Sequence, residues 1–306
     1  MAGFRINTNI PAIFSQRQLG ITNRNIQRNL EKLSSGLRIN RAADDAAGLA
    51  ISERFRTQIN GLKQASKNIQ DGISLIQTAE GGIEQISDQL QRLRTLAVQA
   101  ANDTLTTNDR ALIQLEFNQI LSEIDRQVST VNFNTKVLLD GTYSVVGGTS
   151  LSFQVGANET ETISVNIFTV STAGLGIDNI KVKGTQTATQ TLISAIISNA
   201  TGASASAAGV VTRKGAESAI TLISNAITKI NGLRAELGAI QNRLERTFDF
   251  VQVQMENQAA AESRIRDLDF ASEIVSFTKN QILQQAGTSA LAQANVAPQS
   301  VLQLLR

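Results

Sequence analysis

An apolar residue recurs at every seventh position through two long stretches of this 306-residue chain. The first stretch contains Leu62, Ile69, Ile76, Ile83, Leu90 and Ala97. The second contains Ile230, Leu237, Leu244 and Val251, and its spacing continues through Gln258 to Ile265. This spacing keeps one stripe of an α-helix turned towards a partner helix, so each stretch predicts a long coiled-coil-like helix. Without proline between Asp45 and Ala101, the first helix can run for about 80 Å.

Shorter apolar stripes lie near the two ends of the chain. Their spacing of three, four and seven residues is typical of amphipathic helices. One thin rod cannot bury both stripes, so each end needs the other end and further copies of the chain as partners. Burying a few hundred Å² of apolar surface between copies would stabilise each contact by on the order of several kcal/mol, before the cost of ordering the chains is subtracted. The residues of this predicted self-assembly surface are Leu19, Ile26, Leu30, Leu33 and Leu37 at the front and Phe270, Ile274 and Phe277 at the rear.

Local signals divide the helical regions. A joint is expected near residue 40, with Asp44 or Asp45 at the start of the next helix, where carboxylates are favourable. Thr106, followed three residues later by Asp109, predicts a capping box that opens a third helix. This third helix is expected to fold back antiparallel onto the first long helix.

The middle of the chain changes from helical to alternating periodicity. A polar turn separates two alternating runs, and this pattern predicts a β-hairpin. Residues 186–215 are dominated by Ser, Thr, Ala and Gly and are expected to form a surface segment, with one short helix around Leu192 and Ile196. The alternating runs are Leu151, Phe153 and Val155, then Ile163, Val165 and Ile167.

Composition removes most catalytic chemistry. The chain has no histidine, cysteine or tryptophan. It therefore offers no histidine-based triad, no thiolate nucleophile, no common zinc site and no disulfide. Asp44, Asp45 and Glu53 are the acidic group to consider for a metal or for acid–base work, but a helix start explains such residues. We expect no enzyme activity, no cofactor and no metal.

Charge and hydropathy bound the partners and the location. The net charge is only +2, and basic residues are not clustered, so no nucleic-acid partner is expected. No run approaches 18 uninterrupted apolar residues, so no membrane insertion is expected. The first residues, up to Pro11, lack the apolar core of a cleaved signal peptide, which leaves a cytoplasmic protein or export by another route.

Two sets of long sequence blocks, one at each end of the chain, follow a recognisable pattern. The front blocks are Leu33–Ile51, which reads LSSGLRINRAADDAAGLAI, and Gln77–Gly81. The rear blocks are Leu237–Glu245, Glu256–Asn257, Ala260–Asp267 and Gln285–Gly287. These blocks resemble bacterial flagellin, and the rear ones follow its C-terminal pattern in order and spacing. The resemblance covers roughly residues 1–140 and 215–306, and no family pattern is recognisable in 141–215.

The resemblance implies a mainly α fold, in which both chain ends build a long coiled-coil-like rod with a small β-hairpin in the middle. The terminal helical domain, residues 1–42 and 267–306, would line the core of a filament. Residues 43–185 and 216–266 would form the helical rod with the hairpin. The Ser/Thr/Ala/Gly-rich segment 186–215 would replace any large outer domain.

The resemblance also implies a function and partners. The chain would polymerise with itself into the extracellular flagellar filament that drives swimming. It would leave the cell through the flagellar type III apparatus without a cleaved signal peptide. A flagellar export chaperone would cover the C-terminal helices, including the apolar tail Val301–Leu305. Hook-associated junction and cap proteins would be further partners.

Many flagellins are detected by an innate immune Toll-like receptor through the helical rod. Thr95 stands where the family commonly has an acidic residue, and a solvated helix face or a contact with a neighbouring subunit equally explains Arg92 and Arg94. The positions matching the receptor face are Gln91, Arg92, Arg94, Leu96, Ile113 and Glu116.

Three alternatives stay open at this stage. A flagellar hook–filament junction protein of the same family shares the terminal blocks and differs in abundance. A carboxylate-only enzyme or a surface adhesin would place its cleft or binding site in residues 141–215. A cytoplasmic coiled-coil adaptor would never be exported.

Overall fold

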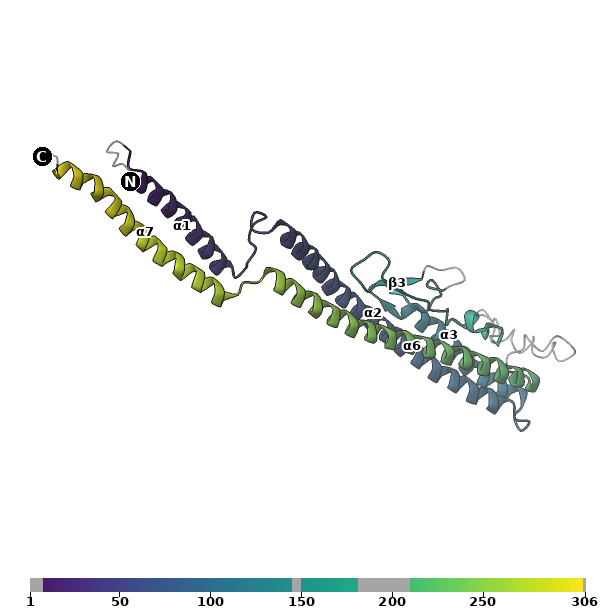
Figure 1. Ribbon diagram of the computed structural model, residues 1–306. Coiled ribbons are helices and arrows are strands. Elements are labelled where there is room, and N and C mark those ends of the chain that lie inside the picture. Colours follow the sequence, from purple (N-terminus) through teal and green to yellow (C-terminus); the bar gives the residue numbers. More distant parts are fainter. Residues whose placement is uncertain (1–7, 145–149, 181–209, 305–306) are drawn as a thin grey trace. The chain divides into compact units, whose positions relative to one another are not determined.

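Long helices make up most of the chain in the computed structural model, which describes residues 8–144, 150–180 and 210–304 (Figure 1). The mainly α fold with a small central hairpin is therefore confirmed. The short helix expected around Leu192 lies outside the described residues. The elements are α1 (Ile10–Ser35), α2 (Ala46–Ala100), α3 (Thr107–Thr130), β1 (Asn132–Phe133), β2 (Lys136–Val137), β3 (Leu151–Gln154), β4 (Thr162–Val165), α4 (Thr172–Leu175), the 3₁₀ turn η1 (Asp178–Ile180), α6 (Arg213–Arg266) and α7 (Phe270–Leu304).

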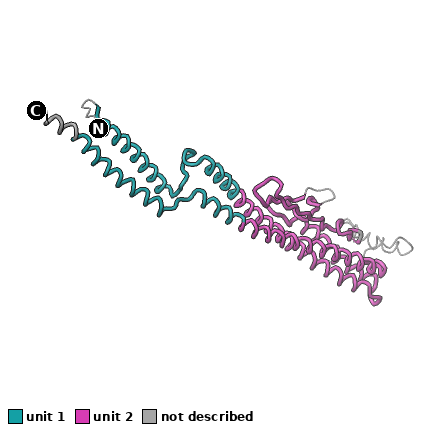
Figure 2. The backbone as a smooth tube through the Cα atoms, in the orientation of Figure 1, with its two compact units in different colours: residues 1–60, 254–306 teal, residues 61–253 magenta. Residues whose placement is uncertain are grey.

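The chain divides into two compact units, residues 1–60 with 254–306 and residues 61–253 (Figure 2). We call them unit 1 and unit 2. The helices α2 and α6 each contribute residues to both units. The domain boundaries drawn from the sequence fall instead in the connections between α1 and α2 and between α6 and α7, and they stay a prediction.

In unit 2, α2 and α6 run antiparallel. The side chain of Gln252 donates a hydrogen bond to the Ser66 hydroxyl at 3.1 Å, and Arg234 forms an ion pair with Glu80 at 3.7 Å. Between these polar contacts, the seven-residue repeats of both helices are buried, as an apolar seam requires. The third helix adds a second apolar face, formed by Phe117, Leu121, Ile124 and Val128.

Polar contacts define the turn between α2 and α3. The predicted capping box is confirmed, because the Thr106 hydroxyl accepts from the Asp109 N–H while the Asp109 carboxylate accepts from the Thr106 N–H. The guanidinium of Arg110 donates to the carbonyls of Ala100 and Asn102 at 2.8 and 3.0 Å. The Ala100 carbonyl is the last of α2 and has no intrahelical partner, so Arg110 closes the helix end.

The predicted hairpin is confirmed as the antiparallel pair of β3 and β4, in which Leu151 faces Val165 and Phe153 faces Ile163. The side-chain amide of Asn68 on α2 donates to the carbonyl of Gln154 at 3.2 Å. A Cβ atom at Gly72 would lie only 3.2 Å from the Phe153 ring. Glycine at this position therefore lets the hairpin lie close against α2.

Unit 1 contains α1, α7 and the connections that follow α1 and precede α7. Helix α1 ends at Ser35 and is capped by Gly36, whose φ of +71° is the left-handed conformation that favours glycine. The two connections are joined by backbone hydrogen bonds, from Arg38 N–H to the Arg266 carbonyl at 2.7 Å and from Leu268 N–H to the Gly36 carbonyl at 3.0 Å. This junction places α1 and α7 side by side (Figure 1).

Candidate interaction surfaces

Helices α1 and α7, which we call the terminal pair, both expose large apolar side chains. Such residues usually turn inward on a helix that has all its partners, and contiguous exposed apolar surface marks an interaction site. These exposed side chains are Ile10, Ile13, Phe14, Ile21 and Leu30 on α1, with Phe270, Ile274, Val275, Ile282, Leu283 and Val296 on α7.

The structure divides the predicted terminal stripe into two groups. Leu30, Phe270 and Ile274 are at least half exposed. The other residues of the stripe are half-buried, so the pair covers them only in part. These half-buried residues are Leu19, Ile26, Leu33, Leu37 and Phe277.

The seven-residue repeats behave differently from the terminal stripe. Their side chains retain at most 3% exposure, so within unit 2 the partner helices of the same chain already cover them. An assembly contact therefore cannot use these residues without opening unit 2. They are Leu62, Ile69, Ile76, Ile83 and Leu90 on α2 and Ile230, Leu237, Leu244 and Val251 on α6.

The residues that match the receptor face lie on α2 and α3. Arg92 and Glu116 meet across these helices, with the guanidinium donating to one carboxylate oxygen at 2.7 and 3.0 Å. Gln91 and Arg94 are exposed, and Ile113 is half-buried. Leu96 is only 2% exposed, so its side chain belongs to the core of unit 2 rather than to a surface.

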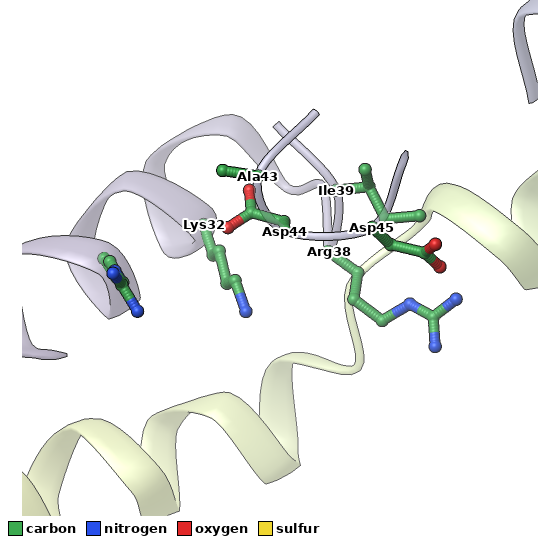
Figure 3. Close-up of a pocket in the computed structure, with 7 residues that line it drawn as sticks. Lys32, Arg38, Ile39, Ala43, Asp44 and Asp45 are labelled. Atoms are coloured by element: carbon green, nitrogen blue, oxygen red, sulfur yellow. The ribbon is translucent and has the colours of Figure 1, made fainter. Parts of the chain in front are cut away.

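A pocket of about 340 Å³ opens beside the connection between α1 and α2 (Figure 3). Its two carboxylates form hydrogen bonds to the backbone in and next to this connection. Asp44 accepts from the backbone N–H groups of Asn40 and Arg41, and Asp45 accepts from Gly48 N–H. The pocket is lined by Arg28, Lys32, Arg38, Ile39, Ala43, Asp44 and Asp45.

The third acidic residue considered from the sequence, Glu53, also has a structural role. Its carboxylate accepts from Arg266 at 2.9 Å and from Arg56 at 3.0 Å, linking the start of α2 to the end of α6. The hydrogen bond from Arg266, reinforced by Arg56, lowers the pKa of Glu53 below its ordinary value. Within the described ranges, acidic side chains form no group of three or more suited to holding a metal ion.

Sequence reasoning missed several buried polar side chains, among them two amides. Asn29 is 9% exposed between α1 and α7, and Gln114 on α3 is 4% exposed. Gln114 follows Ile113 in the apolar stripe of α3, and a glutamine next to such a stripe is a weak signal for a buried hydrogen bond. Asn29 gave no signal in the sequence, because an asparagine beside Leu30 also fits an exposed helix face.

Two family comparisons together cover most of the chain. Residues 6–144 match the bacterial flagellin N-terminal helical region, and residues 220–305 match the bacterial flagellin C-terminal helical region. The chain belongs to the bacterial flagellin family. The two matched regions contain the terminal pair and most of the helical core, and the stretch between them contains the hairpin.

Two relatives match this chain over nearly the full length of both proteins. This flagellin is 47% identical over 306 residues to a 33 kDa flagellar filament core protein of Treponema phagedenis, covering 98% of this chain and 99% of the relative. It is 48% identical over 311 residues to the flagellin of Bacillus subtilis strain 168, and the match covers 99% of this chain and 100% of the relative.

A solved structure supports the fold. The protein, described as a flagellar hook-associated protein from Vibrio parahaemolyticus, has a TM-score of 0.55 and 16% identity, and the match covers 73% of this chain and 100% of that one. At this identity the likeness concerns the fold alone. Within the described residues, none of the helices contains a stretch that is apolar and long enough to cross a membrane.

Proposed function

We propose that this chain is a structural subunit that polymerises into the bacterial flagellar filament outside the cell. Membership of the flagellin family supports this function, and so do relatives named as flagellins and as a filament core protein. The observation that carries the proposal is the exposed apolar surface of α1 and α7. A single copy leaves this surface in water, and neighbouring copies would bury it.

The energetics of the terminal pair favour this proposal. Burying apolar surface contributes about 25 cal/mol per Å², and a fully buried isoleucine or phenylalanine contributes about 1.5–3 kcal/mol. Phe14, Ile274 and Val275 each keep at least half of their surface exposed in one copy. Repeated contacts of this kind along a polymer would offset the cost of ordering each added chain.

Electron microscopy of the purified chain at high concentration tests the proposal. We expect long tubular filaments with a central bore. Chains that lack residues 1–36 or 270–306 should lose them while unit 2 stays helical by circular dichroism. Absence of polymers at any concentration of the full chain would contradict a filament subunit. A product limited to a short layer on preformed hooks would instead indicate the junction protein of the same family.

The exposed surface of α7 also suggests how the chain is handled before assembly. We propose that a flagellar export chaperone covers the apolar residues of α7 in the cell, and that junction and cap proteins contact the terminal helices at the filament ends. Coexpression tests the first contact. The full chain should copurify with the chaperone, and a chain that ends at residue 269 should not. Equal recovery of both chains would contradict this site.

Recognition by a Toll-like receptor is a further proposal, and the exposure of the side chains reduces the number of residues that a receptor could contact. Gln91, Arg94 and the paired Arg92 and Glu116 present polar groups on the surface of α2 and α3, whereas Leu96 is inaccessible. A receptor reporter assay with Arg94→Ala should show a reduced response compared with Arg126→Ala. The second variant is the control, because it changes an exposed arginine that lies on α3 outside this face. An unchanged response would remove this face from the proposal.

A further inference from the structure

The contact between α1 and α7 is unusual because the most buried side chains of α1 are polar. Thr22 and Asn29 are the buried residues of this helix, and the apolar residues around them are half-buried or exposed. Helix pairs in water normally place their apolar residues at the centre of the contact. Hydrogen bonds therefore contribute to this pairing alongside the half-buried apolar residues.

Asn29 is at the centre of these hydrogen bonds. When its amide is oriented so that donors meet acceptors, its nitrogen donates to the Glu273 carboxylate at 3.2 Å and to the Asn25 carbonyl at 2.8 Å. Its oxygen accepts from the Phe277 N–H at 3.1 Å and from the Asn280 side chain at 3.2 Å. One side chain of α1 thus reaches three successive turns of α7.

Further contacts continue the same antiparallel alignment along α1. Asn23 accepts from the Gln284 side chain at 2.8 Å, and Asn9 donates to the Ala294 carbonyl at 2.8 Å. Between them, Leu19 lies so close to Gly287 that a Cβ atom there would be 3.0 Å from its side chain.

Apart from the backbone hydrogen bonds of the junction and the contacts of Asn23 and Asn9, the remaining forces distinguish poorly between this alignment and its neighbours. After Lys279, α7 has no charged side chain before the final Arg306, so ion pairs do not fix the position of this stretch. Aliphatic contacts have no direction, and a slip of one helical turn, about 5.4 Å, would exchange one set for another. Such a slip would separate Asn29 from all its partners on α7. A buried polar group without partners is unfavourable, which is how a single asparagine specifies register in coiled coils.

We infer that Asn29 is the side chain that contributes most to selecting the register of the α1–α7 pair. The alignment it selects leaves residues such as Phe14 and Ile282 on the outside of the pair. The consequence for neighbouring copies rests on the proposed function, whereas the register itself belongs to one chain.

The absence of cysteine from the chain gives a direct test by disulfide trapping. Leu19→Cys with Gly287→Cys reports the observed register. Leu19→Cys with Leu283→Cys, or with Leu291→Cys, reports slips of about one turn in either direction, which native geometry would separate too far for a disulfide. Gel mobility after oxidation separates bonds within a chain from bonds between chains. Each pair is compared in the soluble chain and in any polymer it forms.

With Asn29 present, we expect the 19–287 pair to dominate and the shifted pairs to give little product. With Asn29→Leu, at least one shifted pair should rise to the yield of the 19–287 pair. Asn25→Leu is the matched control, because Asn25 is a half-buried asparagine of the same helix whose side chain is not among the described bonds to α7. Leucine at position 29 adds apolar contact, so we expect the helix pair to stay formed in this variant. An unfolded chain would not give a shifted cross-link at the yield of the 19–287 pair.

Two results would overturn the inference. One is a 19–287 pair that stays dominant with Asn29→Leu, at the level of the control. The other is the absence of this cross-link from both soluble and assembled chains that retain Asn29. Failure of the chain to polymerise would overturn the proposed function alone, because the cross-links within the soluble chain would still report the register.

Discussion

The side-chain oxygen of Gln114 accepts a hydrogen bond from the backbone N–H of Val210 at 2.7 Å. The same side chain donates to the carbonyl of Ile180 at 3.3 Å and to Asn118 at 2.8 Å. Ile180 and Val210 are the described residues on either side of the segment 181–209. One buried glutamine on α3 therefore bonds both of the residues that flank this segment.

Replacing Gln114 with leucine should destabilise unit 2. The N–H of the buried Val210 and the carbonyl of Ile180 would lose their partner, and an unsatisfied buried group costs about 1–3 kcal/mol. Urea unfolding followed by circular dichroism measures this loss. Gln119→Leu, an exposed position of the same helix, is the control, and equal midpoints for the two variants would contradict the bridging role.

The adjacent glycines 81 and 82 of α2 should respond in opposite directions to alanine. Glycine inside a helix costs about 0.5–1 kcal/mol relative to alanine. A Cβ atom at Gly81 meets nothing within 4 Å, so Gly81→Ala should raise the melting temperature by about 2 °C. A Cβ atom at Gly82 would lie 2.8 Å from Val131, whose branched side chain cannot easily turn away. Gly82→Ala should therefore lower the melting temperature.

Thermal unfolding of the two alanine variants checks this contrast. Each variant is the control for the other, because they differ only in which face of the same helical turn receives the methyl group. A rise for both would mean that Val131 and Leu139 yield to the added atom.

The pKa shift of Glu53 predicts a contribution to acid sensitivity. Hydrogen bonds from Arg266 and Arg56 lower its pKa in the folded chain below the ordinary value of 4.5. Such a group stabilises the fold fully above its unfolded pKa, and the contribution is lost as the pH falls through the lowered folded pKa. Glu53→Gln should therefore weaken the fold at neutral pH, and its difference from the unchanged chain should shrink as the pH falls below 4.5.

Melting curves between pH 7 and pH 3 measure this difference. Glu159→Gln supplies a control in the loop between β3 and β4, which lies in unit 2. A constant difference between Glu53→Gln and the unchanged chain across this range would show that the carboxylate does not act through its charge.

The seven-residue spacing predicted the helical core because the repeat can be recognised within each helix and does not depend on knowing the partner. Ile69 and Ile230 repeat in phase with partners supplied by the same chain, so their pattern and burial agree. The capping box of Thr106 and Asp109 was equally readable, since both of its hydrogen bonds lie within four residues. The alternation around Phe153 predicted the hairpin for the same reason.

The terminal pair could be predicted only in part. Spacing identifies a stripe around Leu30 and Ile274, but it does not reveal whether one copy of the chain supplies enough surface to cover it. The buried positions of Asn29 and Gln114 depend on partners far away in the sequence, at Phe277 and at Val210. No local pattern separates such residues from exposed ones, and only the packed structure identifies them.

The exposed face of α7 gives the most direct prediction about assembly. Ile282 is 60% exposed in one copy, and the proposed function places this surface against neighbouring copies. Full burial of an isoleucine contributes about 1.5–3 kcal/mol, and each 1.4 kcal/mol changes an equilibrium about tenfold. Ile282→Ser should therefore raise the concentration needed for polymerisation by about tenfold or more. Thr278→Ser, an exposed change on the same helix, should leave it unaltered. Sedimentation of polymer at a series of concentrations measures both values, with circular dichroism confirming that the helices persist. Equal values for the two variants would mean that Ile282 stays in water after assembly.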